Sequence, residues 1–237
     1  MLNKKIYIYL LAGQSNMAGR GIVPETQETN PRILTLNQQN RWAIAKDPLH
    51  WDKSVAGVGP GLSFAHTILK ELPDDVTIGL VPCACGGSPI ETWQDGKFWE
   101  QTNSHPLDNT IARMEEALKD GELKGILWHQ GEGDSSEERA PLYQQRLETL
   151  IAKFRKSFNA ANAPFIIGQL GQFPDRPWTE YRKQIDNIHK TITETVPYCA
   201  YVSSDGLTSI GDDLHFNTKS QHEFGKRYAK ACLSINN

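Results

Sequence analysis

The sequence contains no apolar run that approaches the roughly 20 residues a membrane-spanning helix needs. It also has no surplus of positive charge, because its formal net charge is -3. Nothing in the charge balance therefore favours binding to nucleic acid or to an anionic membrane. The sequence predicts a protein that binds neither partner.

Cysteine is scarce as well, and the four present are Cys83, Cys85, Cys199 and Cys232. The pair at 83 and 85 does not have the C-x-x-C spacing of a redox motif, and no second pair completes a zinc site. We expect these thiols to be reduced and buried as small hydrophobic side chains. They predict no disulfide framework and no metal centre.

The N-terminus resembles the start of a secretion signal, because Lys4 and Lys5 precede an apolar run at 6–11. The run is short, and it enters Gly13-Gln14-Ser15 without a small-residue cleavage site. We interpret it as the first strand of the fold and expect a cytoplasmic protein. A secreted protein whose signal was trimmed stays open as the alternative.

Short apolar runs alternate with amphipathic stretches along the chain, a pattern typical of α/β proteins. With 237 residues, we expect one domain spanning 1–237. A mostly parallel sheet covered by helices on both faces follows from this alternation. The expected strands are 6–11, 33–36, 76–81, 125–128, 165–170 and 198–203, and the expected helices are 62–72, 107–118, 141–158, 181–195 and 218–233.

Two long irregular segments, 37–61 and 88–106, interrupt this alternation. Loops of this length in a compact domain usually carry function or are disordered, and their aromatic residues argue against disorder. Trp42, Trp51, Trp93 and Trp99 could stack on sugar rings or pack in the core beneath the loops. The sequence leaves both possibilities open.

Three polar segments follow predicted strands, so we expect them at the same edge of the sheet. They are Gly13-Gln14-Ser15-Asn16, Cys85-Gly86-Gly87-Ser88 and His129-Gln130-Gly131-Glu132. A fourth segment, 212–215, precedes the last predicted helix, which could return it to that edge. The carboxyl edge of a parallel sheet is where ligand crevices form.

Together these segments contain the groups that acyl transfer requires. Ser15 is the candidate nucleophile, His215 the base that takes its proton, and Asp212 the acid that orients the base. The N–H groups of Ser15 and Gly87, with the Gln130 amide, are the candidate oxyanion donors. Each segment alone is an ordinary turn or loop, so the prediction depends on their joint occurrence.

These segments resemble the blocks of the SGNH/GDSL hydrolase superfamily. The branch they resemble contains carbohydrate esterase family 6 acetyl xylan esterases and sialate O-acetylesterases. The resemblance runs from the first strand to the last helix, and its four blocks are GQSNM at 13–17, GGSxIxxW at 86–93, WHQGE at 128–132 and DxxHF at 212–216. The usual Asn of the third block is replaced by Gln130, which is characteristic of the carbohydrate branch.

The resemblance implies a three-layer α/β/α sandwich around a five-stranded parallel sheet, the flavodoxin-like SGNH fold. It implies removal of O-acetyl groups from carbohydrates through an acetyl-serine, without a metal or an organic cofactor. Ser15, Asp212 and His215 would form the catalytic triad, and Gly87 would be the second oxyanion donor. Supporting or substrate-binding roles fall to the other motif residues, Gln14, Asn16, Gly86, Glu132 and Trp93, while His129 is expected to be structural.

Three alternatives remain. An esterase or lipase of the same superfamily could act on short acyl esters that are not carbohydrates. A metal-dependent hydrolase could use nitrogen and oxygen ligands from His129, Glu132, Asp134, Asp212 and His215, although their spacing is not that of a known zinc helix. A non-catalytic carbohydrate-binding protein is the third, and the complete set of catalytic residue types argues against it.

Overall fold

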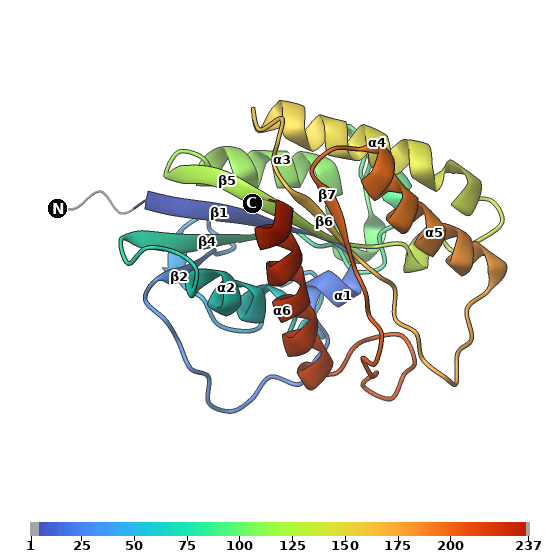
Figure 1. Ribbon diagram of the computed structural model, residues 1–237, viewed down its shortest axis with the longest axis horizontal. Helices are drawn as coiled ribbons and strands as arrows, with labels where there is room; N and C mark the ends of the chain where they lie inside the picture. The colour runs from blue at the N-terminus through green and yellow to red at the C-terminus, as the bar shows by residue number, and fades with distance from the viewer. Residues whose placement is uncertain (1–4, 236–237) are drawn as a thin grey trace.

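The computed structural model describes residues 5–235, and its centre is a seven-stranded sheet (Figure 1). The strands lie in the order β3-β2-β4-β1-β5-β6-β7. Every pair is parallel except β2 and β3, which are antiparallel. The bounds are β1 (Lys5–Gly13), β2 (Ile33–Leu36), β3 (Trp42–Ile44), β4 (Val76–Pro82), β5 (Gly121–His129), β6 (Phe165–Gly168) and β7 (Cys199–Val202).

Helices cover both faces of this sheet. Figure 1 shows α3, α4 and α5 on one side and α2 and α6 on the other, so the predicted three-layer α/β/α arrangement is confirmed. The helices are α1 (Ser15–Ala18), α2 (Gly61–Leu69), α3 (Pro106–Ala117), α4 (Ala140–Ser157), α5 (Glu180–Thr195) and α6 (Thr218–Ile235). Single 3-10 turns are η1 (Ile90–Thr92), η2 (Glu100–Thr102) and η3 (Glu132–Asp134).

The central strands are apolar on both faces because each face meets a helical layer. In β1, Leu10 packs into the cluster formed with α3, α4 and α5, whereas Leu11 packs into the cluster formed with α2 and α6. The same alternation appears in β5, where Ile126 and Leu127 point to opposite layers. This two-sided burial explains why the strands are continuous apolar runs in the sequence.

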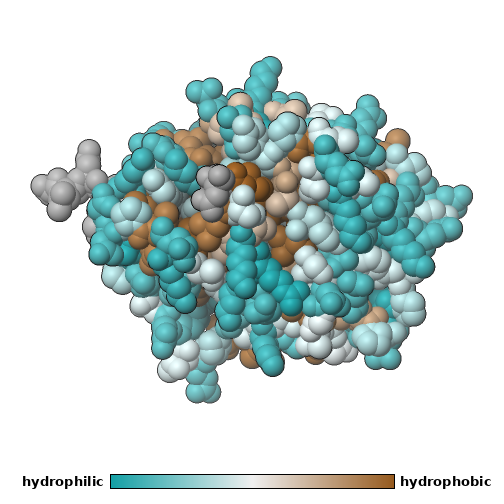
Figure 2. Space-filling view, in the orientation of Figure 1, coloured by the Kyte–Doolittle hydropathy of each residue, from teal (hydrophilic) through white to brown (hydrophobic). Residues whose placement is uncertain are grey.

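Figure 2 shows a mostly hydrophilic face, on which hydrophobic residues gather mainly around the C-terminal end of α6. Within residues 5–235, no helix is both long enough and apolar enough to cross a membrane.

The family resemblance implied a five-stranded sheet. That count is wrong, although the fold class is right. β7 adds a sixth parallel strand, at the place where the sequence alone indicated one. The seventh, β3, lies inside the segment interpreted as a loop, and it turns back on β2 through a bend at Asn37 and Asn40. There the Asn37 side chain accepts hydrogen bonds from the amides of Gln39 and Arg41, and Asn40 adopts a left-handed φ of 55°.

Candidate active site

The three polar segments meet at the carboxyl edge of the sheet, as predicted. Gly13 at the end of β1 pairs with His129 at the end of β5. The backbone N–H of Gln14 donates to the His129 carbonyl at 2.8 Å, and the backbone N–H of Cys85 donates to the Gly13 carbonyl at 2.9 Å. Gly13 has φ of 128°, and a Cβ there would lie 2.1 Å from the His129 carbonyl oxygen. A glycine is therefore required where the chain turns toward Ser15.

Ser15, His215 and Asp212 form one hydrogen-bonded chain. His215 Nε2 lies 3.0 Å from Ser15 Oγ, and His215 Nδ1 lies 2.6 Å from Asp212 Oδ2. Since a carboxylate only accepts, the short contact places the ring proton on Nδ1 and leaves the Nε2 lone pair facing the serine hydroxyl. The arrangement is that of a nucleophile, a base and a residue that orients the base.

Asp212 is held as an anion by its own turn. Its Oδ1 accepts from the amides of Leu214 at 3.0 Å and His215 at 2.8 Å. Partial burial raises the pKa of Asp212, but the hydrogen bonds from the amide and ring of His215 and from the Leu214 amide outweigh it. The net pKa therefore lies below its ordinary value. Asp212 thus stays ionised and can stabilise a positively charged imidazole.

Asn16 fixes the backbone on both sides of His215. Its Nδ2 donates to the Leu214 carbonyl at 3.0 Å, and its Oδ1 accepts from the Phe216 amide at 3.1 Å. Nδ2 also donates to Glu132 Oε1 at 2.8 Å. The segment that follows β5 and the segment that carries His215 are thereby joined through one side chain.

Glu132 is an ionised carboxylate within the protein. Burial raises its pKa, but the hydrogen bond and charge of His129, the charge of Arg182 and the hydrogen bond from Asn16 lower it to about 2. His129 Nε2 lies 3.5 Å from Glu132 Oε1. Both side chains are buried, and Glu132 is linked to the site through Asn16, the residue after Ser15.

We expect Asn16→Ala to lower kcat by about 10-fold or more, since loss of the two backbone contacts frees His215 to leave Ser15. Its melting temperature should also fall by several degrees, about what one buried hydrogen-bond network contributes. Steady-state kinetics and thermal unfolding measure the two effects. Gln27→Ala is the matched control. The Gln27 side-chain amide also makes two backbone hydrogen bonds, but it makes them to the carbonyl and the N–H of Asp47. Unchanged kcat in Asn16→Ala would contradict the positioning role.

The Gly86–Gly87 loop follows β4 and reaches the same edge. Gly86 is buried, whereas Gly87 is partly exposed and has a left-handed φ of 79°. A Cβ on Gly87 would lie 2.9 Å from Gln101 Oε1. Only glycine adopts this turn without strain, and residue 87 is where the loop becomes partly accessible.

Comparison with known proteins assigns this chain to a family. Residues 5–234 match the family described as carbohydrate esterase, sialic acid-specific acetylesterase. The chain belongs to this acetylesterase family. Members are hydrolytic esterases, so the predicted reaction class is confirmed at that level.

Individual relatives agree with the family. A probable carbohydrate esterase of Arabidopsis thaliana is 34% identical over 96% of this chain and 90% of the relative. A probable 9-O-acetyl-N-acetylneuraminic acid deacetylase of Escherichia coli is 25% identical over 73% of this chain, and the match spans 65% of that protein's length.

Solved structures share the fold along the whole chain. The structure of an Arabidopsis thaliana protein superposes with a TM-score of 0.84 at 32% identity, over 96% of this chain and 98% of the other. The structure of NanS has a TM-score of 0.73 at 19% identity, over 98% of this chain and 97% of the other. The second likeness concerns the fold alone.

One sequence expectation for this acetylesterase-family site is wrong: Gln130 does not face the oxyanion position. It is 0% exposed. Its Nε2 donates to the Ser88 carbonyl at 3.1 Å and to Asp134 Oδ2 at 2.5 Å, while its Oε1 accepts from the Tyr143 hydroxyl at 2.9 Å. Both amide hydrogens are used inside the protein, so Gln130 holds the loop together instead of meeting substrate.

We therefore expect Gln130→Ala to act mainly on stability. Removing the amide leaves the Ser88 carbonyl without its buried donor and leaves Asp134 Oδ2 with the Ile90 amide alone. This should lower the free energy of unfolding by about 2–4 kcal/mol. Its kcat should stay within about 10-fold of wild type, below the 10²–10³-fold loss typical of an oxyanion donor. Denaturant unfolding and kinetics at a temperature where the variant is folded distinguish the two. A kcat loss of the larger size in a stable variant would restore Gln130 to the oxyanion hole.

The Gln14 side chain joins two turns of the site. Its Oε1 accepts from the amides of Gly131 and Gly133, both at 3.3 Å. The side chain thus ties the turn before Ser15 to the turn after β5.

The tryptophans divide into core and loop residues. Trp93 is 2% exposed, donates to Ser88 Oγ at 3.0 Å and packs edge-on against Trp128. Of the two possibilities left open for Trp93, packing in the core is the one observed, since a buried ring cannot stack on a sugar. Trp42 donates to Asp120 Oδ2 at 2.9 Å. Trp51 is exposed, with the Arg113 guanidinium 4.7 Å from its ring centre, and Trp99 is half-buried beside Gly86.

The residues considered as metal ligands serve other partners. Asp212 and His215 are bonded to each other, and Asp134 accepts from Gln130. Among the residues the structure describes, no group of three or more histidine, cysteine or acidic side chains is arranged to hold a metal ion.

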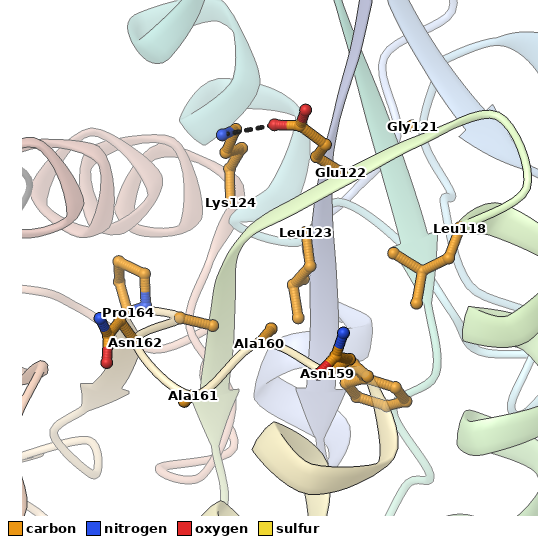
Figure 3. A pocket seen from close by; sticks show the side chains of 12 residues that line it. Leu118, Gly121, Glu122, Leu123, Lys124, Asn159, Ala160, Ala161, Asn162 and Pro164 are labelled. Atoms are coloured by element: carbon orange, nitrogen blue, oxygen red, sulfur yellow. Dashed lines mark ion pairs between the residues drawn. The ribbon is translucent and has the colours of Figure 1, made fainter.

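A separate hollow of about 630 Å³ lies where β5 begins and where the loop before β6 passes. Figure 3 shows Leu118, Leu123 and Asn159 beside it, with the ion pair of Glu122 and Lys124 at its rim. These residues lie at the amino ends of the strands, whereas Ser15 follows a carboxyl end. The hollow is thus at the opposite edge of the sheet from the candidate active site.

Proposed function

We propose that this protein is a serine esterase that removes O-acetyl groups from carbohydrates through an acetyl-serine intermediate. The observation that carries the proposal is the Ser15–His215–Asp212 hydrogen-bonded chain at the carboxyl edge of the sheet. Membership of the acetylesterase family supports the acetyl group and the carbohydrate. The E. coli relative is described as a probable 9-O-acetyl-N-acetylneuraminic acid deacetylase, which makes acetylated sialic acids the first substrates to test.

In the first half-reaction, Ser15 Oγ attacks the acetyl carbonyl carbon while His215 Nε2 takes the serine proton. The N–H groups of Ser15 and Gly87 hold the oxyanion, and Asp212 stabilises the imidazolium. Collapse of the tetrahedral intermediate breaks the ester bond. The sugar oxygen leaves with the proton from His215, and Ser15 carries the acetyl group.

In the second half-reaction, water attacks acetyl-Ser15 while His215 takes a proton from the water. The bond between the acetyl group and Ser15 Oγ breaks, and the serine oxygen recovers its proton from His215. Acetate departs and the enzyme returns to its starting state.

The substrate class is tested by acetate release. Acetylated sialic acid and acetylated xylan are compared with p-nitrophenyl acetate and p-nitrophenyl butyrate, each with and without EDTA. We expect EDTA-resistant release of acetate from at least one acetylated carbohydrate, with kcat/KM above that for the butyrate ester. Hydrolysis confined to the p-nitrophenyl esters would favour an esterase for non-carbohydrate short acyl groups. Activity lost to EDTA and restored by zinc would favour a metal-dependent hydrolase.

A further inference from the structure

The loop that carries Gly87 is fixed by residues outside all four sequence motifs. The Gly86 amide donates to Asp52 Oδ2 at 2.9 Å, and the Gly86 carbonyl accepts from Trp99 Nε1 at 3.1 Å. Asp52 and Trp99 come from the two long irregular segments, one on each side of the loop. Both backbone polar groups of Gly86 are thus held by side chains.

The Trp99 contact determines where the Gly87 N–H points. The Gly86 carbonyl and the Gly87 amide belong to one planar peptide unit, and in a trans peptide they point in opposite directions. The peptide between Gly86 and Gly87 is trans, since within residues 5–235 the cis bond is at Asp47–Pro48. When Trp99 holds the carbonyl on one side, the Gly87 N–H is directed away from Trp99. A hydrogen bond to the carbonyl also polarises the peptide and strengthens its N–H as a donor.

Asp52 is itself held by a buried ion pair. Its Oδ2 lies 2.7 Å from Arg20 Nη2, and the two side chains are 1% and 6% exposed, respectively. Arg20 Nη1 donates to the Gly19 carbonyl at 2.7 Å, at the end of the short helix that begins with Ser15. The pair therefore connects the serine helix to the loop that carries Gly87.

The space around Gly86 is shaped for this contact. A Cβ on Gly86 would lie 2.5 Å from Asp52 Oδ2 and 2.7 Å from Arg20 Nη2. The carboxylate can approach the Gly86 amide only because residue 86 has no side chain. The ion pair and the glycine are mutually dependent parts of one arrangement.

We propose that Trp99, together with the Asp52–Arg20 ion pair, positions the Gly87 N–H as an oxyanion donor. They are positioning residues, since they act through the peptide between Gly86 and Gly87 and not on the substrate. This inference rests on the proposed function. It assigns Trp99 a hydrogen-bonding role in place of stacking on sugar.

Trp99→Phe tests the inference, because it keeps an aromatic ring and removes the donor. We expect kcat for p-nitrophenyl acetate to fall about 10-fold or more, short of the 10²–10³-fold loss of a complete oxyanion donor. KM should stay within about 3-fold, because the developing charge exists only in the transition state.

Trp42→Phe is the matched control. Trp42 is also half-buried and also donates through its indole, in this case to the Asp120 side chain, but it lies on the edge strand β3. Both variants should lose similar thermal stability, whereas only Trp99→Phe should lose kcat. If Trp99→Phe does not fold, Asp52→Asn is the second variant, and it should likewise lower kcat more than KM.

Three outcomes would overturn the inference. They are unchanged kcat in Trp99→Phe, an equal kcat loss in Trp42→Phe, and a rise in KM alone, which would indicate contact with substrate. Wild-type and Ser15→Ala enzyme are measured alongside. If wild type shows no Ser15-dependent hydrolysis, the proposed function fails and the inference fails with it. If wild type is Ser15-dependent and Trp99→Phe is unaffected, only the inference fails.

Discussion

Ser15→Ala is expected to lower kcat for p-nitrophenyl acetate by about 10⁴-fold or more. Without Oγ, no acetyl group can be transferred to the enzyme, and the remaining acceleration must come from substrate binding and the oxyanion donors alone. The substitution removes one hydroxyl from a residue that is 7% exposed. Loss of its single contact with His215 should change the melting temperature little.

Ser135→Ala is the control for this loss. Ser135 follows β5 at the same edge of the sheet, and its hydroxyl donates to the Gly131 carbonyl. It should retain near wild-type kcat. Substantial hydrolysis by folded Ser15→Ala, verified to be free of wild-type enzyme, would show that another group attacks the ester.

Asp212→Asn is expected to lower kcat by about 10³–10⁴-fold with a small effect on KM. An asparagine amide can donate to His215 Nδ1, which would then hold its proton on Nε2 and lose the lone pair that faces Ser15. The substitution also removes the negative charge that stabilises the imidazolium. kcat and KM for p-nitrophenyl acetate measure the effect.

The neighbouring Asp213→Asn provides the matched control, since it makes the same chemical change one residue away. Asp213 has a left-handed φ of 52°, which asparagine also tolerates. Asp213 is half-buried, and the change to asparagine keeps the size of its side chain, so kcat should stay within about 2-fold. Equal losses in the two variants would point to a disturbed loop and not to a role of the Asp212 carboxylate.

Most of the fold follows from apolar patterning. Two-sided burial makes the parallel strands continuous apolar runs, so β1, β4 and β5 are evident in the sequence. β3 is not, because its three residues lie at the sheet edge, where one side meets solvent and the apolar signal is weak. The asparagines at 37 and 40 mark its turn, and this residue type, which favours turns, is the signal in the sequence that could have indicated it.

The candidate site divides in the same way. The sequence predicts contacts well for residues that follow strand ends or that lie close together in the chain. The contact of Ser15 with the Asp212–His215 turn is an example. The direction of Gln130 could not be deduced, since it depends on Asp134 one turn later and on Tyr143 in α4. An amide after a strand can face the ligand or the core, and only its tertiary partners decide which.

Asp52 and Arg20 carry no periodic or motif signal in the sequence. Asp52 lies in an irregular segment, where charged residues are usually solvated. Its role depends on a buried contact with a loop 34 residues away, and that contact emerges only from the folded chain. Residues of the long loops thus contact the motif at a strand end without carrying a motif of their own.

The measurement that tests the central claim most directly is mass analysis of the enzyme during turnover. With p-nitrophenyl acetate, an activated ester, acylation should outrun deacylation, so the acetyl-enzyme should accumulate in a burst. After acid quench, we expect a mass gain of one acetyl group, located by peptide mapping on Ser15. Turnover with no acetylated enzyme, or with the acetyl group on another residue, would contradict the account.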